Sequence, residues 1–176
     1  LFQDNPDERS YPASLTKMMT LYLTFEALHE GRLRLDRELL VSAHAANQSP
    51  SKLELQPGDT IRVEDAILGL TTKSANDAAV VLAEAIGGSE PAFAQRMTEK
   101  AHQLGMSRTV FHNASGLPNT EQFSTVRDMS ALALHLISDW PQYYPYFRTR
   151  SFVYQGKTIK GHNRLLGSYE GADGIK

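Results

Sequence analysis

The segment 14–30 constrains the fold of this chain more than any other, because its apolar side chains recur mostly every three or four residues. This spacing is typical of an α-helix with one apolar face, and Gly31 stands where such a helix would end. We therefore predict a helix over 14–30. Its apolar residues are Leu15, Met18, Met19, Tyr22, Phe25 and Leu28.

Further segments have the pattern of helices, and strand character is expected only near the end of the sequence. There, RSFVYQGKTIKG at 150–161 is typical of two short strands that form a hairpin around Gln155–Gly156. We predict helices over 64–70, 76–88, 89–104 and 126–139.

The starts of three of these helices carry capping signals. We expect Asn76 or Asp77 to cap the helix 76–88, and Ser89 to open the next one. Thr125 and Asp128 have the spacing of a capping box at the start of the helix 126–139. We therefore interpret Asp128 as a helix cap rather than a catalytic carboxylate.

Composition narrows the classes of function. The 176 residues, 41% of them hydrophobic, are enough for one domain, or for one and part of another, with a sizeable core. Eighteen basic and 20 acidic residues, without a basic stripe, argue against a nucleic-acid partner. The absence of cysteine excludes disulfides and thiolate chemistry, and the six histidines show no metal-binding motif. We accordingly predict neither a metal nor another cofactor.

The sequence was also searched for membrane-spanning and targeting segments. Its apolar stretches are short and interrupted by charge, so we expect none to span a bilayer. The first residues, LFQDNPDERS, lack the charged and apolar regions of a signal peptide. Any targeting segment is expected to have been removed or to lie outside this chain, and membrane association is expected only through such segments.

The sequence PASLTK at 12–17 places a hydroxyl and an amine on the same face of the predicted first helix. Helix-start N–H groups and the helix dipole stabilise negative charge near the oxygen of Ser14, and Lys17 lies three residues further on. A buried, neutral lysine amine can accept the serine proton during attack on a carbonyl. The alternative is an ordinary cap at Ser14 with a solvated Lys17.

The same four-residue pattern occurs again in SPSK at 49–52, as Ser49 and Lys52. Here the following residues, LELQPGD, predict an extended segment and a turn rather than a long helix. We therefore interpret Ser49 and Lys52 as loop residues.

Two later motifs support the first pair. KSAND places Ser74 and Asn76 before a predicted helix, and the chain ends in DGIK at Lys176. S-x-x-K, S-D-N and K-T-G, in this order, are the signature elements of penicillin-binding proteins and class A β-lactamases. Here the middle element is S-A-N, and the third is represented only by its lysine. With the contexts YPASLTKMMT, LTTKSANDAAVVLAEAIGG and GADGIK, the chain resembles the low-molecular-mass penicillin-binding proteins that are serine-type D-alanyl-D-alanine carboxypeptidases.

The resemblance implies a role for each matching residue. Ser14 would be the nucleophile, acylated by a peptidoglycan stem peptide ending in D-Ala-D-Ala or by a β-lactam antibiotic. Lys17 would accept its proton, Ser74 would relay a proton to the leaving amine, and Asn76 would hydrogen-bond the substrate and hold Lys17. Lys176 would keep Lys17 deprotonated and attract the substrate carboxylate.

Arg148 in FRTRSF matches an arginine of the family, and the resemblance implies that it lies near the substrate carboxylate. A guanidinium suits that role, although an ordinary surface arginine explains the residue as well. The family's cell-wall substrate implies a periplasmic or other extracytoplasmic location, with attachment to the inner membrane in the full-length protein.

The implied architecture is α+β and predominantly α, with the serine β-lactamase/transpeptidase-like fold truncated at both ends. We expect a single, partial transpeptidase-like catalytic domain over 1–176, with a helical subdomain at about 30–150. Strands beyond Lys176 would normally supply the second oxyanion donor, the first being the backbone N–H of Ser14.

Two other classes of function remain open. A β-lactamase would need a glutamate that activates the deacylating water, and Glu90, Glu99 and Glu121 lack the expected E-x-x-x-N-like context. A non-catalytic domain that binds β-lactams or cell-wall peptides is the other alternative, and it would be acylated without turnover.

Overall fold

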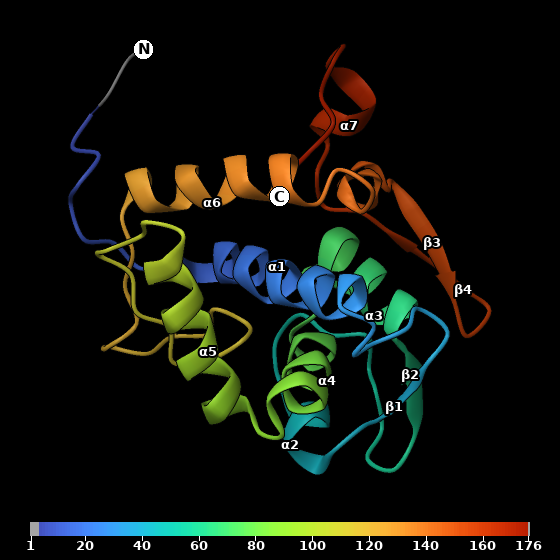
Figure 1. Ribbon diagram of the computed structural model, residues 1–176. Helices are drawn as coiled ribbons and strands as arrows, with labels where there is room; N and C mark the ends of the chain where they lie inside the picture. The colour runs from blue at the N-terminus through green and yellow to red at the C-terminus, as the bar shows by residue number, and fades with distance from the viewer. Residues whose placement is uncertain (1–3, 176) are drawn as a thin grey trace.

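One central helix organises the chain in the computed structural model, which describes residues 4–175. Helix α1 spans Thr16–His29 and buries every residue from Thr16 to Phe25. Figure 1 shows α1 in the middle of the molecule, with α6 along one side and α4 and α5 on the other, and α1 contacts all three. Because α1 is covered in this way, its buried polar side chains need partners inside the protein.

The remaining elements surround this helix. Short turns of 3-10 helix cover Ala13–Leu15 and Tyr144–Arg148, and a π-helical turn covers Gly69–Lys73. The strands form two antiparallel pairs, β1 Glu38–Leu40 with β2 Thr60–Arg62 and β3 Ser151–Tyr154 with β4 Lys157–Lys160. The other helices are α2 Ala43–Ala46, α3 Val63–Leu68, α4 Asn76–Gly87, α5 Glu90–Gln103, α6 Val126–Asp139 and α7 Leu165–Ser168.

The predicted helices and the late hairpin are confirmed, with small shifts at their ends. The first helix begins at Thr16 rather than at residue 14, because Ala13–Leu15 forms a tighter 3-10 turn. The predicted helix 64–70 becomes α3 followed by the π-helical turn. The β3–β4 hairpin turns at Gln155–Gly156, where both residues have positive φ, as a two-residue hairpin turn of this kind requires.

The prediction that strands appear only late in the chain was wrong. An early hairpin, β1–β2, pairs Leu39 with Ile61, and the single-turn helix α2 also went unpredicted. Each of these strands turns one buried side chain inward, Leu39 or Ile61, between two exposed neighbours. A single inward residue is too short an alternation to identify from the sequence.

The prediction that Asn76 or Asp77 caps α4 was also wrong. No side chain caps this helix, and the fully buried Asp77 carboxylate instead accepts hydrogen bonds from the backbone N–H groups of Leu53, Leu55 and Ala78 at 2.9, 3.2 and 2.8 Å. Burial raises the pKa of Asp77, although these three donors act in the opposite direction. Asp77 thus holds the loop that follows α2 against α4.

The capping box of α6 is present only in part. The Thr125 hydroxyl accepts a hydrogen bond from the Asp128 N–H at 3.1 Å, as predicted. The Asp128 carboxylate, however, accepts from the Arg108 N–H and the Thr109 hydroxyl at 2.9 and 2.7 Å. Asp128 therefore joins the start of α6 to the preceding loop.

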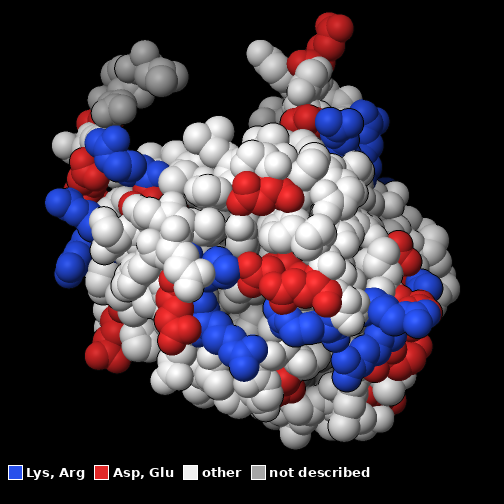
Figure 2. All heavy atoms as spheres, viewed as in Figure 1, with Lys and Arg blue, Asp and Glu red and all other residues white. Residues whose placement is uncertain are grey.

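The surface carries charges of both signs. On the face seen in Figure 2, Lys and Arg side chains lie beside Asp and Glu rather than in one continuous basic patch. Within residues 4–175, no helix combines the length and the hydropathy that a membrane crossing requires.

We predict that Asp77→Ala lowers the free energy of unfolding by about 3 kcal/mol or more, because it leaves buried N–H donors without an acceptor. Urea unfolding followed by circular dichroism measures the change. The control is Asp59→Ala, which removes an exposed carboxylate from the neighbouring turn and should change stability by less than about 0.5 kcal/mol. Equal effects of the two substitutions would contradict the role given to Asp77.

Candidate active site

Ser14 lies in the 3-10 turn that leads into α1, and its side chain is exposed. It borders a cavity of about 500 Å³ together with Ser74, so the structure brings these two predicted residues to one hollow. The other lining residues are Thr71, Thr72, Phe147, His162, Asn163, Arg164, Leu165, Gly174 and Ile175.

Lys17 follows Ser14 by one helical turn and points into the protein. It is only 1% exposed, and its Nζ atom donates hydrogen bonds to Asn76 Oδ1 at 2.7 Å and to the Ser115 carbonyl oxygen at 2.5 Å. The predicted contact between Asn76 and Lys17 is therefore present. No sequence signal identifies Ser115, because its contribution is a backbone carbonyl.

The loop that contains the second S-x-x-K pattern holds Asn76, which follows Ser74 by two residues. Ser74 ends the π-helical turn in the left-handed region, with φ of 58°. Asn76 donates through Nδ2 to the Ser49 carbonyl at 3.1 Å and through its backbone N–H to the Ser51 carbonyl at 2.7 Å. The interpretation of Ser49 and Lys52 as loop residues is confirmed, and their loop orients Asn76.

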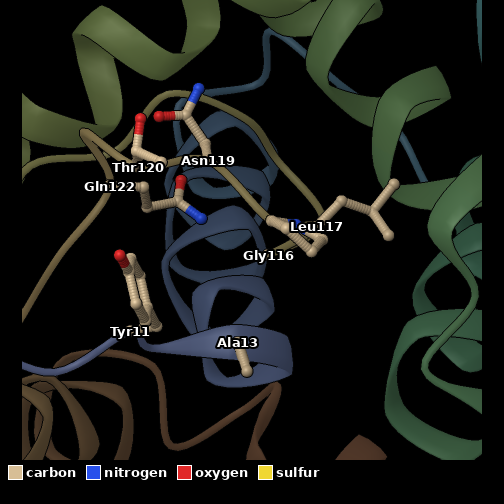
Figure 3. Close-up of a pocket in the computed structure, with 8 residues that line it drawn as sticks. Tyr11, Ala13, Gly116, Leu117, Asn119, Thr120 and Gln122 are labelled. Atoms are coloured by element: carbon tan, nitrogen blue, oxygen red, sulfur yellow. The ribbon is translucent and has the colours of Figure 1, made fainter.

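The turn that carries Ser14 lies against Gly116. A Cβ atom added to Gly116 would stand 1.7 Å from the Ala13 carbonyl oxygen, and Gly116 has φ of +85°. Figure 3 shows Ala13 and Gly116 on the border of a second hollow, of about 410 Å³, between the N-terminal segment and the loop 116–122. Only glycine permits both this backbone conformation and this close approach.

The structure leaves one predicted site residue, Arg148, apart from this group. Arg148 does not line the cavity of Ser14, since its guanidinium pairs with the Asp173 carboxylate at 2.9 Å. Lys176 lies outside the described residues. Among the described residues, the basic side chains that line the cavity are those of His162 and Arg164. Residues 4–175 contain no group of three or more His, Asp or Glu side chains arranged to hold a metal ion.

The family model and the curated relatives that match this chain indicate the same family. The family model for D-alanyl-D-alanine carboxypeptidase matches residues 1–176. The chain is 35% identical over 181 residues to the D-alanyl-D-alanine carboxypeptidase DacF of Bacillus subtilis, covering all of this chain and 46% of that protein. The chain thus spans about half the length of the curated relatives it matches.

Solved structures agree with this result. The D-alanyl-D-alanine carboxypeptidase DacD of Francisella tularensis superimposes with a TM-score of 0.94 at 28% identity, over all of this chain and 55% of the other. Penicillin-binding protein D2 of Listeria monocytogenes, in its cefotaxime-bound form, gives 0.82 at 32% identity, over 99% of this chain and 72% of the other. These matches confirm the predominantly helical, transpeptidase-like fold.

We predict that Gly116→Ala lowers the free energy of unfolding by at least about 2 kcal/mol more than Gly105→Ala does, because only the former also overpacks its surroundings. Gly105 is a matched control, since its φ is +82° and an added Cβ would meet no atom within 4 Å. Urea unfolding of both variants measures the difference. Similar stabilities of the two variants would show that the backbone at Ala13 and Gly116 can move apart at little cost in free energy.

Proposed function

The chain belongs to the D-alanyl-D-alanine carboxypeptidase family, and we propose that it removes the terminal D-alanine from peptidoglycan stem pentapeptides through an acyl-enzyme on Ser14. One observation carries this assignment of residues. The Lys17 amine is buried between Asn76 and Ser115, one helical turn after an exposed serine that shares its cavity with Ser74.

In the proposed acylation, Ser14 Oγ attacks the carbonyl carbon of the penultimate D-alanine while its proton passes to Lys17 Nζ. Burial disfavours the charged form of a lysine amine. A neutral amine satisfies two acceptors with its two hydrogens and accepts the serine proton with its lone pair. The contacts of Lys17 with Asn76 Oδ1 and the Ser115 carbonyl agree with this requirement.

The remaining steps use the same residues. The backbone N–H of Ser14 stabilises the oxyanion, and the C–N bond then breaks. Ser74 relays a proton to the departing D-alanine amine, and Asn76 hydrogen-bonds the substrate backbone. Water then hydrolyses the ester and regenerates Ser14. We assign Lys176 and, once it is released from Asp173, Arg148 to the substrate carboxylate, and the guanidinium of Arg164, which lines the cavity, would support the same attraction.

The same chemistry explains reaction with β-lactams, whose strained amide would acylate Ser14. The β-lactam-bound forms of the Listeria protein, with cefotaxime and with ampicillin, support this partner class. Because the substrate belongs to the cell wall, we propose that the protein acts outside the cytoplasm.

A β-lactamase is the second candidate, and the lining of the cavity argues against it. None of the described residues that line the hollow of Ser14 carries a carboxylate. The Glu90 carboxylate, one of the candidates for water activation, is bonded to the Ala114 N–H and to His44. Slow release of the acyl group from a penicillin adduct, with faster release of D-alanine from a peptide, distinguishes the peptidase from a β-lactamase.

We predict that a penicillin forms a covalent adduct on Ser14 and on no other serine. Ser14 is exposed at the start of the helix that carries Lys17, whereas Ser49 and Ser51 lie in the loop that supports Asn76. Peptide mapping by mass spectrometry locates the adduct, and Ser14→Ala is the control. An adduct on Ser49 or Ser51 would overturn the assignment of the nucleophile.

We also predict that Lys17→Arg slows acylation by a penicillin about 10²-fold or more, because a guanidinium stays protonated and cannot act as the base. Lys52→Arg, in the second copy of the motif, is the matched control, and this variant should be acylated at the rate of the unmodified protein. Stopped-flow acylation kinetics measure both. Rapid acylation of the Lys17 variant would mean that the residue acts through its charge alone.

A further inference from the structure

We propose that Glu90 is a positioning residue for the Ser14–Lys17 pair, because it fixes the loop segment 113–116 on which the Lys17 amine rests. This inference rests on the proposed function of that pair. Glu90 is the first residue of α5 and does not line the cavity of Ser14. It therefore acts through the segment and not on the substrate.

Both oxygens of the Glu90 carboxylate are engaged inside the protein. Glu90 is 8% exposed, and its Oε1 atom accepts a hydrogen bond from the Ala114 N–H at 2.9 Å. Its Oε2 atom lies 2.6 Å from Nε2 of His44, a residue of α2 whose side chain is 54% exposed. The carboxylate is thus held from one side by a surface histidine while it holds a buried amide on the other.

The held amide belongs to the segment that contacts the catalytic helix. The Ala114 carbonyl accepts a hydrogen bond from the Thr20 hydroxyl at 2.7 Å, three residues after Lys17 on α1. The next carbonyl, that of Ser115, accepts the Lys17 amine, and the next residue, Gly116, lies against the Ala13 carbonyl before Ser14. Three consecutive residues therefore set the positions of base and nucleophile, and Glu90 fixes the first of them.

The buried Ala114 N–H needs a hydrogen-bond acceptor at the position that Glu90 Oε1 occupies. A buried amide without an acceptor is unfavourable, so removal of the Glu90 oxygen favours a shift of the segment toward another partner. The Ser115 carbonyl would move with it, and with that carbonyl the Lys17 amine. A displacement of catalytic groups by about 1 Å is enough to slow a reaction about 10²-fold.

The test compares substitutions of Glu90 in the full-length protein. Penicillin acylation kinetics separate the dissociation constant of the penicillin from the acylation rate constant. Glu90→Ala should lower the rate constant by about tenfold to a hundredfold and leave the dissociation constant unchanged. Glu90→Gln keeps an acceptor oxygen for Ala114 and should restore the rate constant. Glu90→Asp keeps the charge at the helix start but withdraws the oxygens, and should be slow.

The matched control is Glu26→Ala, which breaks a partly buried ion pair of the same length, 2.6 Å, between α1 and Lys100 of α5. It should leave the acylation rate constant unchanged. An unchanged rate constant in Glu90→Ala overturns the proposal, as does a Glu90→Gln variant as slow as the alanine variant. Where Glu90→Ala does not fold, Glu90→Asp decides, and acylation at the normal rate in that variant also overturns the proposal.

A measurement without any reaction separates this inference from the proposed function. The NMR signals of the Lys17 side chain, recorded without penicillin, should shift in Glu90→Ala and return in Glu90→Gln. Unchanged Lys17 signals in Glu90→Ala overturn the positioning role. If the unsubstituted protein forms no adduct on Ser14, the proposed function fails, and these signals still decide whether Glu90 sets the position of Lys17.

Discussion

The rest of the site depends on one buried amine and on the groups that accept its hydrogen bonds. Lys17 lies inside the protein, where an amine needs hydrogen-bond partners close at hand. These partners come from the start of α4, through Asn76, and from the loop before α6, through the Ser115 carbonyl. Three segments distant in sequence therefore have to meet at one point, which lies one helical turn from Ser14.

Each of those segments is held by further polar contacts. Carbonyl groups of the loop 49–51 hold Asn76, and the neighbouring Asp77 carboxylate clamps the residues that follow this loop. On the other side, Glu90 and Thr20 hold Ala114. Buried groups with satisfied hydrogen bonds specify one arrangement, because any other leaves them without partners.

Local patterns predicted much of the fold and the central pair of the site. Periodic apolar residues identified α1, α4, α5 and α6, and the Gln155–Gly156 turn identified the late hairpin. Sequence patterns missed β1 and β2. Each of these strands has three residues, of which only the middle one is buried. They also assigned a capping role to Asn76 or Asp77, because a polar residue before a helix has the same signature whether its partner is local or distant.

The sequence by itself determined the longer helices, the late hairpin, the family and the spacing of Ser14 and Lys17, because each of these depends on a few neighbouring residues or on motifs with a fixed order. Only the tertiary structure decided that Lys17 is buried, that the second S-x-x-K segment supports Asn76, and that Arg148 pairs with Asp173 and does not line the cavity. These outcomes depend on which distant backbone groups and charges come within hydrogen-bond reach once the helices pack. A backbone carbonyl such as that of Ser115 carries no side-chain signature, so its role becomes visible only when the chain is folded.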